Sequence, residues 1–196
     1  MHIEKNIYKS IIGILLNAIG KSKDSINARL DMVSMGIRQQ LAPKVYGSRT
    51  CLPHACYTFT KEEKKRFCKV LYELKVSDGY SSNLKSHVNL RELKLINLKS
   101  HDCYLLMQQL LPVAIRGSLD AKLQSAITRL CFFFNSLCAK TIDPLKLDAL
   151  QVCIIETICE LEMFFPPSFF NIMVHLTVHL VREVQHVNAG TFVYFA

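Results

Sequence analysis

The chain has 196 residues, of which 50% are hydrophobic and 20% are charged, so its composition excludes a disordered protein and allows one sizeable core. There are 24 Lys and Arg against 16 Asp and Glu, a net charge of +8, which favours a polyanionic partner, although lysine-rich solvated helix faces give the same balance. The apolar runs are too short to span a bilayer and the first residues lack a secretory signal pattern, so we expect no membrane partner and a nuclear or cytoplasmic location.

Local signals predict helices and loops in the N-terminal half. Apolar residues at helical spacing predict a first helix that ends near Gly20, and Asp24 is the expected N-cap of a second helix. Residues 43–59 show neither helical nor strand period and contain Gly and Pro, which indicates a loop. Thr60-Lys61-Glu62-Glu63 is a capping box and predicts a third helix, and a short helical piece is expected over residues 89–95.

From Ser100 onward the helical pattern is richer and more apolar. Further helices are expected before Pro112 and over residues 119–139, 144–165 and 168–186. Because the connections between them are short, they predict a bundle. We therefore expect a mainly α fold, with N-terminal helices and loops in residues 1–99 and a helical bundle in residues 100–196.

One of these helices is predicted to lie at the centre of the bundle. Its segment from Leu130 to Phe134 is apolar nearly all round, as expected of a helix with neighbours on every side. We therefore expect Phe132, Phe133 and Phe134 to be buried.

Cysteine and histidine spacing gives little support for a metal site. Most of the eight cysteines lie in apolar helical patterns, where free Cys behaves as a small hydrophobic residue, so we expect reduced thiols. Cys51 and Cys56 flank His54, but no second Cys/His pair at finger spacing completes a tetrahedral zinc set. We expect no bound metal.

The last predicted helix has two chemically different faces. Pro166 and Pro167 precede Ser168, which is the expected N-cap. At about 100° per residue, the polar residues gather in one arc, which we expect to be exposed: Ser168, Asn171, His175, His179, Arg182 and His186. The apolar residues gather on the other side, which we expect to be buried: Phe169, Met173, Leu176, Leu180 and Val184.

His175 and His179 lie one helical turn apart, so two neutral imidazoles could share one zinc ion. Zinc proteases of this kind need a Glu directly after the first His, and Leu176 stands there instead. A basic, hydrogen-bonding face is the preferred interpretation, and a zinc-dependent enzyme remains an alternative.

Several ordered motifs carry a resemblance to a known family. They are Met1-His2-Ile3-Glu4-Lys5-Asn6 and the segments 20–24, 55–58, 78–83, 98–103, 108–117 and 165–184. Together they resemble the plant CACTA (En/Spm) transposase, in its C-terminal catalytic region and the adjoining plant domain of unknown function. The resemblance covers the chain from about Met1 to Val184.

The resemblance implies a remnant of an RNase H-like DNA transposase, in which acidic residues hold two divalent metal ions such as Mg²⁺. In the family an Asp precedes the Met-His-Ile-Glu-Lys-Asn motif, and this chain begins after it. Asn171 stands where the family usually has Asp. The candidate catalytic acids that remain are Glu162, Glu183 and Asp102, and they do not make a two-metal site by themselves. We expect no independent catalysis and no cofactor in this chain, whereas its being an enzyme is left open.

DNA and an intact transposase are the expected partners, and no small-molecule substrate is expected. The candidate DNA-binding residues are Lys64, Lys65, Arg66, Arg116, His175, His179 and Arg182. Two functions follow: a transposase fragment with an ancestral role in DNA transposition, or a domesticated helical module that binds nucleic acid or protein.

Overall fold

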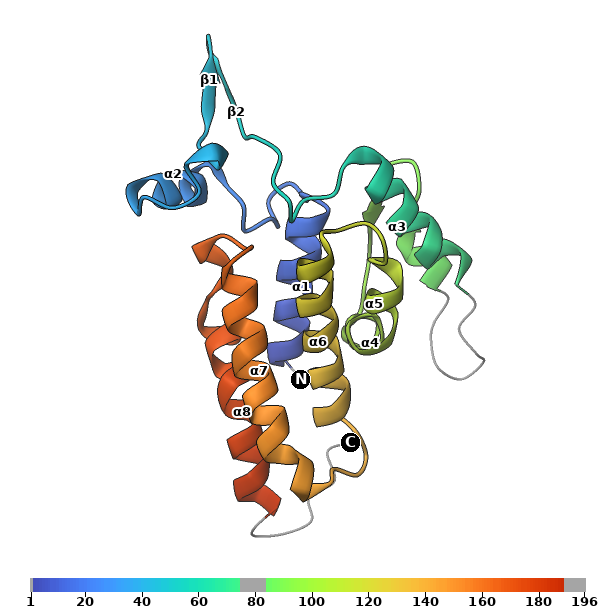
Figure 1. Cartoon of the computed structure of the whole chain (residues 1–196). Coiled ribbons are helices and arrows are strands. Elements are labelled where there is room, and N and C mark those ends of the chain that lie inside the picture. Colours follow the sequence, from blue (N-terminus) through green and yellow to red (C-terminus); the bar gives the residue numbers. More distant parts are fainter. Residues whose placement is uncertain (1, 75–83, 189–196) are drawn as a thin grey trace.

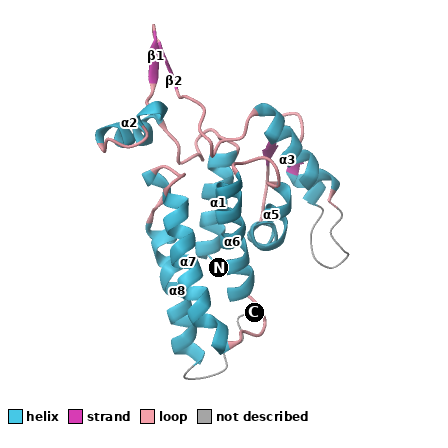
Figure 2. Cartoon of the chain, in the orientation of Figure 1, coloured by secondary structure: helices cyan, strands magenta, loops and turns pink. Residues whose placement is uncertain are grey.

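A computed structural model describes residues 2–74 and 84–188 of the chain, and it is mainly helical, as predicted (Figures 1 and 2). The helices are α1 (His2–Leu15), α2 (Ile26–Ser34), α3 (Lys61–Glu73), α4 (Ser100–Leu105), α5 (Leu111–Ala114), α6 (Ala121–Leu137), α7 (Leu147–Glu162) and α8 (Ile172–Asn188). A π-helical turn, Leu106–Leu110, joins α4 to α5. The described strands form two short antiparallel hairpins: β1 (Lys44–Tyr46) with β2 (Arg49–Cys51), and β3 (Val88–Asn89) with β4 (Lys94–Leu95).

Long helices form the body of the molecule. Figure 1 shows α1, α6, α7 and α8 running side by side; α7 packs against α6 and α8, and α1 packs against α8 and α4. Helix α3 lies at the side, over α5 and the β3 strand. The expected bundle is therefore present, and α1 from the N-terminal half is part of it.

The most enclosed helix is α1 rather than α6. Every residue from 10 to 16, at the end of α1 and one residue beyond it, is buried. This stretch therefore has neighbours on every side. On α6, Phe133 and Phe134 are buried, but Phe132 is 57% exposed. The predictions of a central α6 and of a buried Phe132 are therefore wrong. The apolar run is longer than the buried face of α6, because one side of that helix faces solvent.

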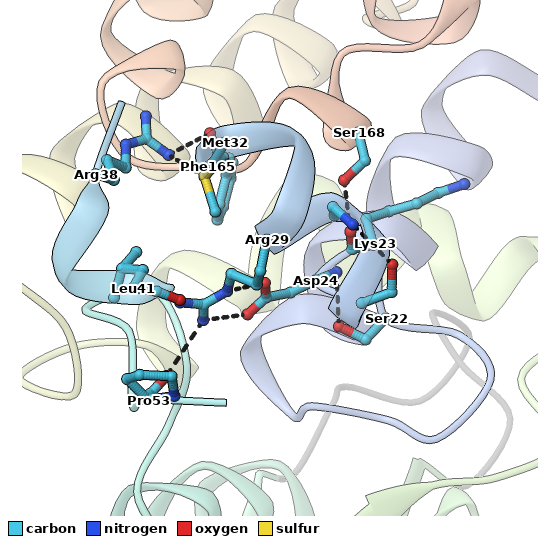
Figure 3. Close-up of polar contacts among 12 residues, drawn as sticks. Ser22, Lys23, Asp24, Arg29, Met32, Arg38, Leu41, Pro53, Phe165 and Ser168 are labelled. Atoms are coloured by element: carbon cyan, nitrogen blue, oxygen red, sulfur yellow. Dashed lines mark hydrogen bonds and ion pairs between the residues drawn. The ribbon is translucent and has the colours of Figure 1, made fainter. Parts of the chain in front are cut away.

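Asp24 does not cap α2 as predicted. Ser25 is the cap, and its hydroxyl accepts a hydrogen bond from the Ala28 amide at 3.2 Å. Asp24 instead pairs with the buried Arg29 (Figure 3). A buried guanidinium without a counter-charge costs more free energy than the loss of one N-cap bond. Asp24 therefore pairs with Arg29, and Ser25 caps the helix.

The helical piece expected over residues 89–95 is also wrong, because β3 and β4 occupy this region. The Asn89 side-chain oxygen accepts hydrogen bonds from the amides of Arg91 and Glu92, both at 3.0 Å. Such a local side-chain bond turns the backbone out of a helical path. Similarly, the expected loop at residues 43–59 contains the β1–β2 hairpin.

The last helix begins later than predicted. Pro167–Phe169 forms a separate 3₁₀ turn, and α8 starts at Ile172 with the Asn171 side chain accepting from the Met173 amide at 2.9 Å. The Ser168 hydroxyl donates to the Lys23 carbonyl instead of capping the helix (Figure 3). The capping box of α3 is confirmed, with the Glu63 carboxylate accepting from the Thr60 amide.

Candidate nucleic-acid interface

An open groove of about 1490 Å³ lies where α1, the α1–α2 connection, the start of α3, residues 91–98 and the start of α8 meet. Seven cationic side chains line it: Lys9, Lys21, Lys23, Lys61, Lys64, Arg91 and Lys94. Among the described residues that line it, the single carboxylate is Glu92, which forms an ion pair with Lys94. We call this surface the basic groove.

Gly13 allows the α1–α2 connection to lie directly on α1. A Cβ atom at this position would come 2.5 Å from the Lys21 carbonyl oxygen, so any larger residue would push the connection away. The Ala18 amide also donates to the Gly13 carbonyl at 2.9 Å, and the Ser22 amide donates to the Ala18 carbonyl. These contacts hold Lys21 and Lys23 beside α1.

The start of α3 supplies two more lysines. The Phe59 amide donates to the Leu15 carbonyl at 2.8 Å, which ties the segment before α3 to the end of α1. Lys61 and Lys64, three residues apart, therefore share the side of α3 that faces the basic groove. Partial burial lowers the pKa of Lys64, because desolvation disfavours the charged ammonium. A bound anion would offset this cost.

Only one of the predicted DNA-binding residues on α3 lines the basic groove, namely Lys64. Lys65 and Arg66 are exposed and do not line it. The Arg66 guanidinium donates to the Gly117 carbonyl at 2.8 Å, next to the exposed Arg116. Arg66 thus supports the turn before α6.

The predicted polar face of α8 lies at the surface, with His175, Arg182 and His186 exposed and His179 half-buried. The Nε2 atoms of His175 and His179 are 3.2 Å apart. The buried side is centred on Val174, Thr177 and Val181 together with Leu180, whereas Met173, Leu176 and Val184 are only partly buried. The buried face of α8 is therefore rotated about the helix axis relative to the predicted one. Thr177 can lie in the core because its hydroxyl donates a hydrogen bond to the Met173 carbonyl.

The candidate catalytic acids occupy separate places. Asp102 is buried, and its carboxylate accepts from the Lys99 amide at 2.8 Å and lies 3.7 Å from His87 Nε2. Glu162 is exposed at the end of α7 and Glu183 is exposed on α8. Within residues 2–74 and 84–188, no three His, Cys, Asp or Glu side chains form a metal-binding group.

The sequence pattern did not identify most of the basic groove. Its lysines come from four segments that are brought together only by packing around α1, so no local spacing in the sequence predicts them. The nearest signal in the sequence is the pair Lys61 and Lys64 at helical spacing within a predicted helix.

Residues 137–194 match a domain of unknown function (DUF4218), from the end of α6 through α8. No curated protein and no solved structure matches the chain. None of the helices in the described residues has the length and apolarity to cross a membrane. The C-terminal part of the chain is therefore similar to a domain that occurs in plant transposase-like proteins.

Proposed function

We propose that this chain is part of a CACTA-like DNA transposase, and that it binds nucleic acid through the basic groove without cleaving it by itself. The domain match at residues 137–194 and the resemblance of its ordered motifs support the family. The convergence of seven cations with one paired carboxylate is the observation that carries the binding activity.

The chemistry of the basic groove suits a phosphate backbone. Lysine ammonium groups are compact charges on flexible stems, so they follow a line of phosphates without reading base edges. Each neutralised phosphate releases counterions, which makes such binding favourable and sensitive to salt. The expected contact is thus strong at low ionic strength and nearly independent of sequence.

The test is fluorescence anisotropy with a labelled DNA duplex across a series of salt concentrations. The logarithm of the binding constant should fall linearly with the logarithm of salt, by about 0.9 per phosphate contacted. The pair of changes Lys61→Gln and Lys64→Gln should reduce that slope by about 1 to 2. Lys65→Gln on the same helix is the matched control, because Lys65 does not line the basic groove.

Two results would contradict the proposal. Binding that does not depend on salt concentration would show that the chain does not contact phosphates. An equal loss of affinity from Lys65→Gln and from the Lys61 and Lys64 changes would show that the interface lies on the outer side of α3.

A further inference from the structure

The β1–β2 hairpin projects from the helical body beside α2 (Figures 1 and 2). Every residue of both strands is exposed, including Val45 at 70% and Tyr46 at 64%. A two-stranded hairpin is marginally stable on its own, and this one buries none of its strand residues. Its side chains are therefore exposed to solvent and are not part of the core.

Strand register sorts these side chains onto two faces. Tyr46 lies opposite Arg49 and Lys44 lies opposite Cys51, whereas Val45 lies opposite Thr50. Because directly opposed residues share a face and successive residues alternate, Tyr46 stands on one face between two cations. We call this face, made of Lys44, Tyr46, Arg49 and Cys51, the Tyr46 face.

The turn places Arg49 opposite Tyr46, and the local charge favours an anionic partner for the Tyr46 face. Gly47 has a positive φ of 59°, which fits the two-residue turn that brings Tyr46 and Arg49 together. No Asp or Glu occurs in the sequence from Pro43 to Phe59. The face thus combines an exposed aromatic ring with uncompensated positive charge.

We propose that the Tyr46 face binds single-stranded nucleic acid, with an unpaired base stacked on Tyr46 and the neighbouring phosphates paired with Lys44 and Arg49. Aromatic rings flanked by basic residues are the usual platform for unpaired bases, because every base offers a π face. In a duplex the base faces are already stacked on each other, so a surface ring reaches them only after costly unstacking.

This proposal rests on the proposed nucleic-acid binding and adds its substrate form. The basic groove attracts any phosphate backbone, whether paired or unpaired. The Tyr46 face would make the chain prefer the unpaired form.

The experiment compares a labelled single strand with the duplex of the same sequence, using the whole chain. Tyr46→Val keeps a β-favouring residue but removes the ring, and should weaken single-strand binding by about 5- to 100-fold, the loss of one stacked base. Duplex binding should change less than about twofold, since phosphate contacts do not need the ring. Tyr46→Phe should retain single-strand binding.

Val45→Thr is the matched control, because Val45 is equally exposed on the opposite face of the same strand. It should leave both affinities unchanged. Circular dichroism and thermal midpoints of all three variants should equal those of the original chain, because no strand residue is buried.

Failure of this proposal is distinguishable from failure of the proposed function. If the Lys61 and Lys64 changes lower the affinity for both DNA forms while Tyr46→Val changes neither affinity, the basic groove is the binding site and the proposal for the Tyr46 face is overturned. If Tyr46→Val lowers single-strand affinity while the lysine changes have no effect, only the proposal for the basic groove is overturned. Concentration-dependent self-association that Tyr46→Val abolishes would assign the hairpin to a second copy of the chain and overturn the proposal.

Discussion

Arg29 and Asp24 form a buried, two-bond ion pair, with Arg29 Nη2 2.7 Å from Asp24 Oδ2 and Arg29 Nε 2.5 Å from Asp24 Oδ1 (Figure 3). The same guanidinium donates to the carbonyls of Leu41 and Pro53, at 3.0 and 3.3 Å. These carbonyls lie on either side of the β1–β2 hairpin in the sequence. One side chain therefore fixes both ends of the segment that carries the hairpin.

Asp24→Ala should destabilise the protein by about 3–5 kcal/mol, because it leaves a buried guanidinium without its counter-charge. Chemical denaturation followed by circular dichroism measures the loss. Asp31→Ala is the control, since Asp31 is exposed on α2, the helix that carries Arg29, and this change should cost less than about 0.5 kcal/mol. Equal stability of the two variants would show that Arg29 finds another partner.

The phenylalanine run on α6 offers three adjacent substitutions with different expected outcomes. Phe133→Ala and Phe134→Ala remove buried rings and should each cost about 3–5 kcal/mol, whereas Phe132→Ala should cost about 1 kcal/mol or less. Thermal denaturation of the three variants gives the comparison. A Phe132 change as severe as the other two would mean that the exposed side of α6 is covered in solution.

The burial of the Glu4 carboxyl predicts that the stability of the fold depends on pH. Glu4 is 1% exposed, and burial raises the pKa of its carboxyl above the usual 4.5, although a hydrogen bond from Gln108 Nε2 at 2.9 Å opposes this. A raised pKa in the folded state gives stability that is complete below the unfolded pKa and is lost as pH rises through the folded pKa.

Glu4→Gln should therefore gain stability relative to the original chain as pH increases from 4 to 7, because the amide cannot ionise. Denaturation midpoints measured at both pH values test the difference between the two chains. Glu156→Gln, an exposed position on α7, should show no such divergence. A constant difference between Glu4→Gln and the original chain at all pH values would show that Glu4 titrates normally.

The purified chain should not cleave DNA with CACTA-type ends in the presence of magnesium or manganese. Asp102 is engaged at the start of α4, and Glu162 and Glu183 lie on different helices without a third ligand among the described residues. Plasmid nicking is the measurement. Metal-dependent nicking that persists after alanine substitution of both glutamates would place the site elsewhere.

Elements with local chemical signals could be predicted from the sequence. The capping box at Thr60 depends on residues within four positions of each other, and it occurs as expected. Apolar periodicity likewise located α1, α6, α7 and α8 to within a few residues.

Features that depend on distant partners could not be predicted. Asp24 looks like a helix cap until the burial of Arg29 is known. The basic groove depends on the closeness of Lys9, Lys23 and Lys61, which only the packed α1 brings together. The hairpin at residues 44–51 could not be predicted, because its strands are too short to show an alternation of apolar and polar residues and neither of its faces is apolar.

The contact between α1 and α8 bears on what the DUF4218 match represents. Residues 137–194 contain α7 and α8 but only the last residue of α6 and none of α1, although α7 packs on α6 and α8 packs on α1. Excised on its own, this segment would expose the apolar surfaces that the two missing helices cover. We therefore expect that the matched stretch does not fold by itself. A chain cut near residue 137 should lose its structure in both pieces, and mixing the two pieces should restore it.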